Sequence, residues 1–163
     1  MANTEALKRR FEWLPTIIIT LCVVALSVFG SMATNSQGEW YRSLAKPEWN
    51  PPSWVFAPVW TTIYILLIIS ATIIWHKTNG VERRKLITLF AINGLFNLLW
   101  SFAFFQAEST VLGFVDILLV WITVLMLVIK TWPVSRAASL MLVPYLLWVT
   151  FATALNGAIM AMN

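Results

Sequence analysis

Three residues near the carboxyl end of the chain have side chains suited to holding a flat apolar molecule. Trp148, Ala152 and Asn156 follow one another at intervals of four residues, so a helix would place them on one face. The indole can stack on a planar ligand, the alanine leaves room for it, and the amide offers one polar contact. Packing against a neighbouring helix explains the same pattern equally well, so both interpretations stay open at this point.

A second set of residues combines amides with rings at the same spacing. Asn93, Asn97, Trp100 and Phe104 would share one helix face. Two amides in an apolar segment must face protein, a cavity or each other, because lipid offers them no hydrogen bonds. They can serve a ligand, or they can join helices through hydrogen bonds of about 1 kcal/mol each.

The segment between residues 40 and 60 is rich in rings and in proline. It contains four tryptophans, one tyrosine and four prolines in 21 residues. Rings with a polar edge favour the membrane–water boundary, and prolines restrict the backbone that carries them. We expect a rigid aromatic lid over a helical bundle. Trp60 and Tyr64 share a face just after it, and for Tyr64 an interfacial aromatic belt is the preferred interpretation.

Several common kinds of catalytic site lack the residues they need. The single histidine, His76, and the single cysteine, Cys22, lie far apart, so their spacing predicts no metal site. The sequence contains no Gly-rich phosphate loop and no Ser–His–Asp arrangement that a membrane bundle could assemble. The basic residues lie at the ends of apolar runs rather than in one patch, which argues against nucleic acid as a partner.

Asp116 is the only acid well inside an apolar run. It lies about two turns from the start of that run, near one membrane interface. We expect a structural role for it, either accepting a hydrogen bond from a loop N–H or pairing with Arg42 or Lys46, rather than a catalytic one.

The elements that must position these side chains are membrane helices. Of the 163 residues, 60% are hydrophobic and only 11% are charged, whereas a soluble domain carries about 25% charged residues. Five apolar runs can each cross a bilayer, and backbone groups in lipid must be satisfied within a helix. The expected spans are 11–34, 53–75, 86–107, 109–129 and 137–161. The sequence therefore predicts a single all-α domain, a bundle of five transmembrane helices.

The charges that flank these spans predict their orientation. Nine basic residues fall at one end of an alternating bundle, and only Arg42 and Lys46 fall at the other. The positive-inside rule then predicts a cytosolic N-terminus. The C-terminus and the aromatic lid are expected on the far face.

The lid segment resembles the hallmark of the TspO/MBR family, the tryptophan-rich sensory proteins and translocator proteins once called peripheral-type benzodiazepine receptors. The matching residues are Trp40-Tyr41, Leu44, Lys46-Pro47, Trp49, Pro51-Pro52, Pro58-Val59-Trp60-Thr61, Tyr64, Asn97, Pro144-Tyr145, Trp148, Phe151-Ala152 and Leu155-Asn156. With the five spans, the resemblance covers essentially the whole chain.

The resemblance implies a membrane receptor or sensor that binds porphyrins, including protoporphyrin and haem, and benzodiazepine-type drugs beneath the first loop. It implies a role in tetrapyrrole regulation or transport, and it implies homodimers. Porphyrin or haem would be the ligand, and no cofactor is required. The residues expected to contact the ligand, from the resemblance and from the side chains, are Tyr41, Trp49, Trp60, Asn97, Trp100, Trp148, Ala152 and Asn156.

Two other functions are carried as alternatives. Trp60 and Trp148 match the tryptophans that bacterial members use in light- and oxygen-dependent porphyrin breakdown, which would make the protein a weak photochemical enzyme. Transport of porphyrins or sterols is the other, although an odd number of spans and the lack of a proton relay count against it.

The carboxyl end departs from the animal members of the family. Asn156 is followed by Gly-Ala-Ile-Met-Ala-Met-Asn, which lacks the tyrosine and the basic residue of their proposed sterol motif. High-affinity sterol binding is therefore not expected. The departure favours a member from a bacterial cell membrane.

Overall fold

Five long helices form the protein, which is seen here in a computed structural model that describes residues 13–163. The elements are α1 (Trp13–Ala33), α2 (Glu39–Ser43), the 3₁₀ turn η1 (Ser53–Val55), α3 (Phe56–Lys77), α4 (Gly80–Ser101), the π-helical turn η2 (Phe102–Gln106), α5 (Thr110–Thr131) and α6 (Arg136–Met162). Five of these segments are long and apolar enough to span a membrane, so the predicted all-α fold with five spans is confirmed. Residues 8–12, which hold the first basic cluster and the expected start of the first span, lie outside the described residues.

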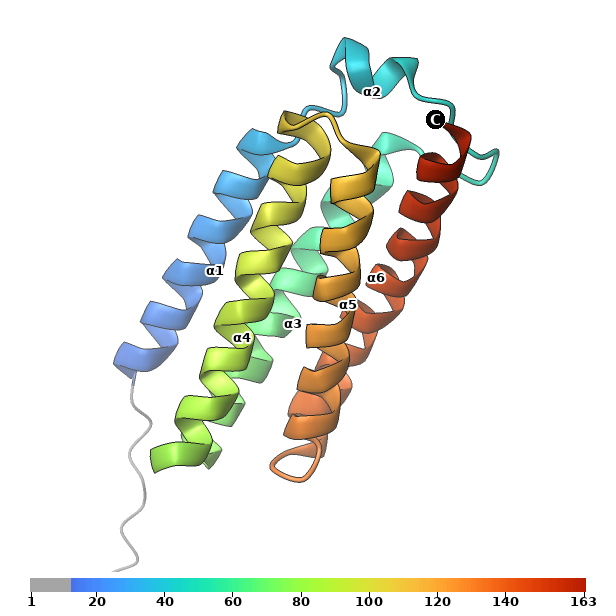
Figure 1. The fold of residues 1–163 in the computed structure, drawn as a ribbon. Helices are drawn as coiled ribbons and strands as arrows, with labels where there is room; N and C mark the ends of the chain where they lie inside the picture. Colours follow the sequence, from blue (N-terminus) through green and yellow to red (C-terminus); the bar gives the residue numbers. More distant parts are fainter. Residues whose placement is uncertain (1–12) are drawn as a thin grey trace, which may run out of the picture.

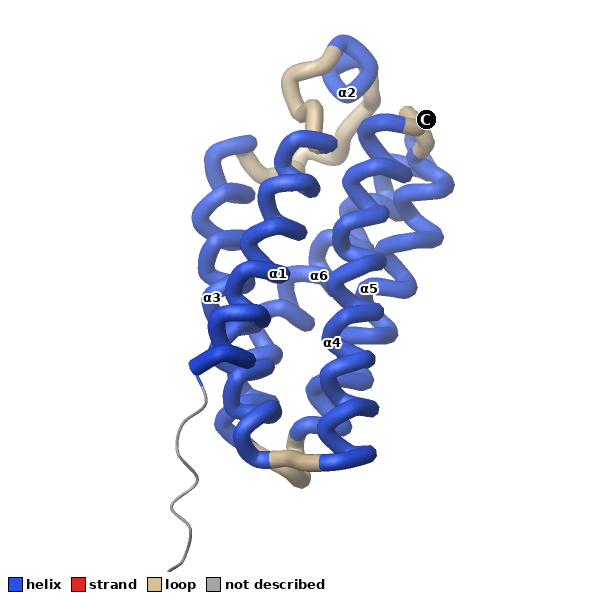
Figure 2. The backbone as a smooth tube through the Cα atoms, turned by 90° about the vertical axis from the view of Figure 1, so that its left-hand side faces the viewer, coloured by secondary structure: helices blue, strands red, loops and turns tan. Residues whose placement is uncertain are grey.

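The five helices run side by side, and one end of the bundle is covered (Figure 1). Residues 34–52, which include α2 and are called the lid below, lie at the end where α6 finishes (Figures 1 and 2). Asn163 ties the lid to α6, because its Oδ1 accepts a hydrogen bond from Ala45 N at 2.9 Å and its Nδ2 donates to Ala45 O at 3.0 Å. We call this the lid end and the opposite one the basic end.

The short connections explain why successive long helices are antiparallel. Gly80 has φ +51° and Glu108 has φ 49°, so both turns use the left-handed region that permits a sharp reversal. Ser109 Oγ accepts a hydrogen bond from Leu112 N at 3.2 Å and caps α5. In the turn that precedes α4, Asn79 is the N-cap residue of that helix.

Some helix ends differ from the apolar runs. The run expected at 86–107 belongs to a helix that begins six residues earlier, at Gly80, and α3 continues to Lys77 rather than ending at Trp75. Hydrophobicity marks where a helix can meet lipid, whereas the helix itself continues through the charged residues beside the membrane. α6 also continues through Pro144, although that residue supplies no N–H to the carbonyl of Leu140.

The buried side chains form two clusters of different composition. The larger is mainly aliphatic, and we call it the aliphatic core; its completely enclosed members include Ile74, Val124, Leu127 and Leu142. The smaller lies under the lid and is called the lid cluster. It is built on buried Phe104, Leu155 and Ile159, with Trp40, Tyr41, Leu44, Phe56, Trp100, Phe105 and Phe151 packed against them.

Candidate ligand-binding site

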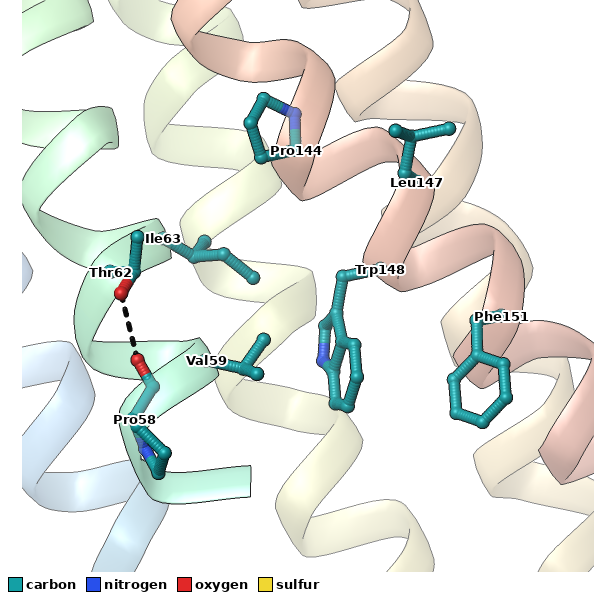
Figure 3. Close-up of a pocket in the computed structure, with 8 residues that line it drawn as sticks. All are labelled: Pro58, Val59, Thr62, Ile63, Pro144, Leu147, Trp148 and Phe151. Atoms are coloured by element: carbon teal, nitrogen blue, oxygen red, sulfur yellow. Dashed lines mark hydrogen bonds between the residues drawn. The ribbon is translucent and has the colours of Figure 1, made fainter. Parts of the chain in front are cut away.

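An open groove of about 540 Å³ lies between α3 and α6. The first turns of α3 contribute Pro58, Val59, Thr62 and Ile63, and the middle of α6 contributes Pro144, Leu147, Trp148 and Phe151 (Figure 3). Its volume falls within the range of about 300–1,000 Å³ that is typical of small-molecule sites. The groove can therefore hold a compact ligand at the depth of the membrane spans.

The wall of the groove is almost entirely apolar. The hydroxyl of Thr62 does not face a guest as a free donor, because it donates to the carbonyl of Pro58 at 2.9 Å (Figure 3). Figure 3 shows the indole of Trp148 standing between the two helices, with Val59 beside it. Binding here would depend on apolar contact and ring stacking rather than on charge.

Trp148 is held by aromatic neighbours on two sides. Its ring meets Phe56 edge-on at 5.6 Å between centroids and lies tilted against Phe151 at 5.5 Å. Phe151 in turn meets Trp49 of the lid edge-on at 5.7 Å. A continuous row of rings therefore connects the groove with the lid.

The centre of the bundle holds a polar bridge rather than a ligand-sized space. Tyr64 Oη donates to Asn97 Oδ1 at 3.3 Å, and Asn97 Nδ2 donates to Tyr145 Oη at 3.2 Å. Trp60 stacks on Tyr64 at 5.6 Å. The cavity beside Asn97, which Asn93 also lines, has a volume of only about 10 Å³, close to the minimum for one water molecule.

The lid cluster takes up two more of the expected site residues. Tyr41 contacts Phe104 and Phe105, at 6.3 and 5.4 Å between ring centroids. Trp100 stacks on Phe104 at 5.4 Å, with their planes 16° apart. Lys46 lies 4.4 Å from the centroid of the Tyr41 ring and donates to the carbonyl of Tyr41, which holds this part of the lid in place.

Burial changes the acidity of the Tyr41 hydroxyl. Desolvation raises the pKa of Tyr41 above its ordinary value of 10.0, and the neighbouring Asn50 side chain acts in the opposite direction. The ring therefore stays neutral throughout the physiological pH range and packs as an apolar surface.

The eight expected site residues thus lie in several places. Trp148 lines the groove, Trp60 and Asn97 lie at the bundle centre, Tyr41 and Trp100 lie in the lid cluster, and Trp49 joins the lid to Phe151. Ala152 packs against the aliphatic core. Asn156 is buried and donates to the carbonyl of Ala152 at 3.1 Å, while its own Oδ1 has no hydrogen-bond partner among the described residues.

Of the eight residues that line the groove, seven were absent from the expected site, and helical spacing offered a signal for two of them. Phe151 lies three residues after Trp148, and Pro144 lies four residues before it, so helical spacing around Trp148 could have identified both. The four groove residues of α3 had no such signal, because their contribution depends on which helix packs beside α6.

The prediction that Asp116 pairs with Arg42 or Lys46 is wrong. Asp116 Oδ2 is buried and has no hydrogen-bond partner among residues 13–163. Arg42 instead donates to Gln37 Oε1 at 2.8 Å, and Lys46 donates to the carbonyls of Tyr41 and Leu44. The two cations of the lid thus bond within the lid and do not reach the acid on α5.

The chain shares its sequence with a known group of membrane proteins. The profile of the TspO/MBR family matches residues 18–162. The chain belongs to the TspO/MBR family. The family predicted from the loop motif is confirmed, and with its five apolar helices this TspO/MBR chain is an integral multi-pass membrane protein.

Named relatives extend across nearly the full chain. Tryptophan-rich protein TspO of Chlorobaculum tepidum is 39% identical over 155 residues, which cover 90% of this chain and 96% of the relative. Tryptophan-rich protein TspO of Archaeoglobus fulgidus is 40% identical, with 88% and 93% covered. The translocator protein of Homo sapiens is 33% identical, with 88% and 87% covered. This TspO/MBR chain therefore matches whole relatives and not one shared segment.

Proposed function

We propose that this TspO/MBR protein is a membrane receptor that binds porphyrins, including protoporphyrin and haem, and related planar hydrophobes such as benzodiazepine-type drugs. The groove between α3 and α6 is the binding site, and tetrapyrrole sensing or transport is the role it serves. The observation that carries the proposal is the exposed face of Trp148 in an apolar groove of about 540 Å³. Membership of a family with relatives named translocator protein supports it.

The chemistry of the groove matches a flat macrocycle better than a polar metabolite. A tetrapyrrole offers a large π surface to the indole of Trp148 and to the ring of Phe151. Its carboxylates must stay near water, and the groove begins at the first turn of α3, beside the lid. The basic side chains of the lid, Arg42 and Lys46, are the cations at that end.

A titration of the Soret band of protoporphyrin, with the protein in nanodiscs, tests the proposal. Trp148→Ala removes the stacking surface and is expected to weaken binding by about tenfold or more. Ala152→Phe is expected to weaken it as well, by filling space beside the same helix face. Trp132→Ala is the matched control, because that tryptophan is 45% exposed just beyond α5 and lines no part of the groove. Equal affinity in all four proteins would refute the site.

A light-dependent breakdown of bound porphyrin is a second candidate, which the position of Trp148 favours. Its indole faces the space where the macrocycle would lie, so it can pass an electron to the excited porphyrin, with dioxygen as the oxidant. Trp60 lies further inside, edge-on to Tyr145 at 6.1 Å. Illumination under oxygen should bleach the Soret band in a manner that requires both tryptophans. Bleaching that survives their replacement by phenylalanine is free photochemistry.

We also propose that the basic end faces the cytosol and that the lid lies on the far side. Six of the nine flanking basic residues are described, and they lie in or beside the turns opposite the lid. A cysteine replacing Ser43, in a Cys22→Ala background, should react with an impermeant thiol reagent added outside intact cells. A homodimer stays a prediction, which light scattering of the purified protein would measure.

A further inference from the structure

One phenyl ring occupies the space beneath the lid. Phe104 is only 2% exposed, although it lies at the end of a helix beside a surface loop. Its centroid lies 5.3 Å from Trp40, 5.4 Å from Trp100 and 5.0 Å from Phe105. The ring thus lies between the lid and the last turn of α4, in contact with Tyr41 and Trp100.

We propose that Phe104 is a built-in occupant of a ligand pocket under the lid, and that a porphyrin seated in the groove extends there only when this ring moves out. The inference rests on the proposed function, and it adds the residue that limits the size of the guest. Phe104 would then determine specificity, by excluding large macrocycles more strongly than small planar molecules.

The backbone that carries Phe104 has an unusual geometry. Residues 102–106 form a π-helical turn, closed by the hydrogen bond from Ala107 N to Phe102 O at 2.8 Å. Such turns are rare and are frequent at functional sites, because the extra residue in the turn changes where its side chains point. Glu108 follows with φ 49°, a conformation that a residue with a side chain rarely adopts. A return of this turn to ordinary helical geometry would change the direction of the Phe104 side chain.

A glycine on the neighbouring helix makes the present position of the ring possible. A Cβ atom added to Gly113 of α5 would lie 2.5 Å from Phe104 Cδ2 and 3.0 Å from Phe104 Cβ. No side chain could stand at Gly113 while the ring remains where it is. The slot for the ring is therefore a shaped feature of two helices rather than a chance contact.

The space held by Phe104 adjoins the groove. Phe56 and Phe151 pack against the lid cluster, and both also contact Trp148. A macrocycle stacked on Trp148 is therefore separated from Phe104 by one layer of side chains. Movement of the ring would join the two spaces into a single longer pocket.

Two buried polar atoms provide an independent indication that a guest belongs in this region. Trp100 Nε1 and Asn156 Oδ1 are buried, and neither has a hydrogen-bond partner among the described residues. Trp100 packs in the lid cluster, and Asn156 follows its member Leu155 in the chain. Buried polar groups are normally paired, so a donor and an acceptor left free here are suited to the polar edge of a guest.

Titration of protoporphyrin into the full chain in nanodiscs tests the role of Phe104. Phe104→Ala empties the slot, so we expect the dissociation constant to fall by about tenfold. Phe104→Leu should give a smaller fall, and it keeps the test meaningful if the alanine variant does not fold. Phe102→Ala is the matched control, since this ring lies in the same π-helical turn but is 44% exposed and is not part of the lid cluster. Its affinity should stay within about twofold of the wild type.

The outcomes separate the inference from the function on which it rests. If the wild type binds protoporphyrin and neither Phe104 variant binds it more tightly, Phe104 is a wall of the site and the inference is overturned. If no protein in the series binds protoporphyrin, the proposed function itself fails. A wild type that binds weakly beside a Phe104→Ala variant that binds tightly supports both.

Discussion

The two ends of the bundle are closed by different kinds of side chain. Toward the basic end, branched aliphatic residues such as Ile74, Leu127 and Leu142 are completely enclosed. Toward the lid, the buried residues are surrounded by rings that meet at centroid distances of 5.0 to 6.3 Å, most of them edge-on or tilted. Interlocked aliphatic chains fit one arrangement, whereas rings can exchange edge-on and stacked partners at a small energetic cost. We therefore expect stability to depend mainly on the basic end and ligand binding to depend mainly on the lid end.

The largest expected effect belongs to the aliphatic core. Leu142→Ala should lower the free energy of unfolding by about 2–5 kcal/mol, because it leaves a cavity at a fully enclosed position. Leu140→Ala on the same helix is the matched control, since that side chain is 56% exposed and should cost far less. Unfolding followed by circular dichroism in detergent measures both. The porphyrin affinity of Leu142→Ala should be measured at a temperature at which the variant is still folded. A large change in that affinity would contradict the proposed division between the two ends.

The contact between α5 and the lid cluster should give the second largest effect on stability. Gly113→Ala forces a Cβ against the Phe104 ring and should cost about 1–3 kcal/mol of stability. In a Phe104→Ala background the same change should be neutral or stabilising by up to about 1 kcal/mol, because alanine is the better helix former. Gly30→Ala, whose Cβ would meet its nearest atom at 3.7 Å, should be tolerated in either background. Equal costs of Gly113→Ala with and without Phe104 would contradict the packing described here.

The polar bridge between the two ends should contribute less to the free energy of unfolding. Asn97→Leu removes the hydrogen bonds to Tyr64 and Tyr145 and should lower stability by about 1 kcal/mol for each bond. Tyr64→Phe removes only the first of them and should cost about half as much. Thermal unfolding of both variants measures the difference. A bridge that contacted the ligand directly would instead show its main effect in the porphyrin titration.

The smallest expected effect is the dependence of the protein's stability on the ionisation of Tyr41 in the lid. The pKa of Tyr41 is raised in the folded protein, so its stabilising contribution is fully present below the ordinary pKa of 10.0 and is lost as pH rises through the folded-state value. The melting temperature of the wild type should therefore fall more steeply above about pH 10 than that of Tyr41→Phe. Identical slopes for the two proteins would show that the hydroxyl of Tyr41 is not buried beneath the lid.

Much of this architecture could be predicted because membrane helices leave a strong signal. Lipid requires long apolar runs, so the five spans were recognisable, and the serine cap at Ser109 and the Asn79-Gly80 turn follow from local chemistry. The family followed from the spacing of rings and prolines in the lid. Trp148 was identified by its four-residue spacing and lines the groove.

The rest depends on contacts between helices. The spacing of residues along one helix does not reveal which other helix will pack beside it. The groove exists because α3 packs beside α6, and the slot for Phe104 exists because Gly113 lies on a different helix. The π-helical turn at 102–106 adds a residue to the turn that ordinary helical spacing does not anticipate. Asn156 shares a face with Trp148 as expected, but its neighbours enclose it instead of opening it to the groove.

A structure of the protein with protoporphyrin bound in a lipid environment tests the central claim most directly. The account predicts a macrocycle between α3 and α6, stacked against Trp148, with one edge directed toward the lid. A macrocycle bound elsewhere on the bundle, with the groove between Val59 and Trp148 filled only by lipid, would contradict it.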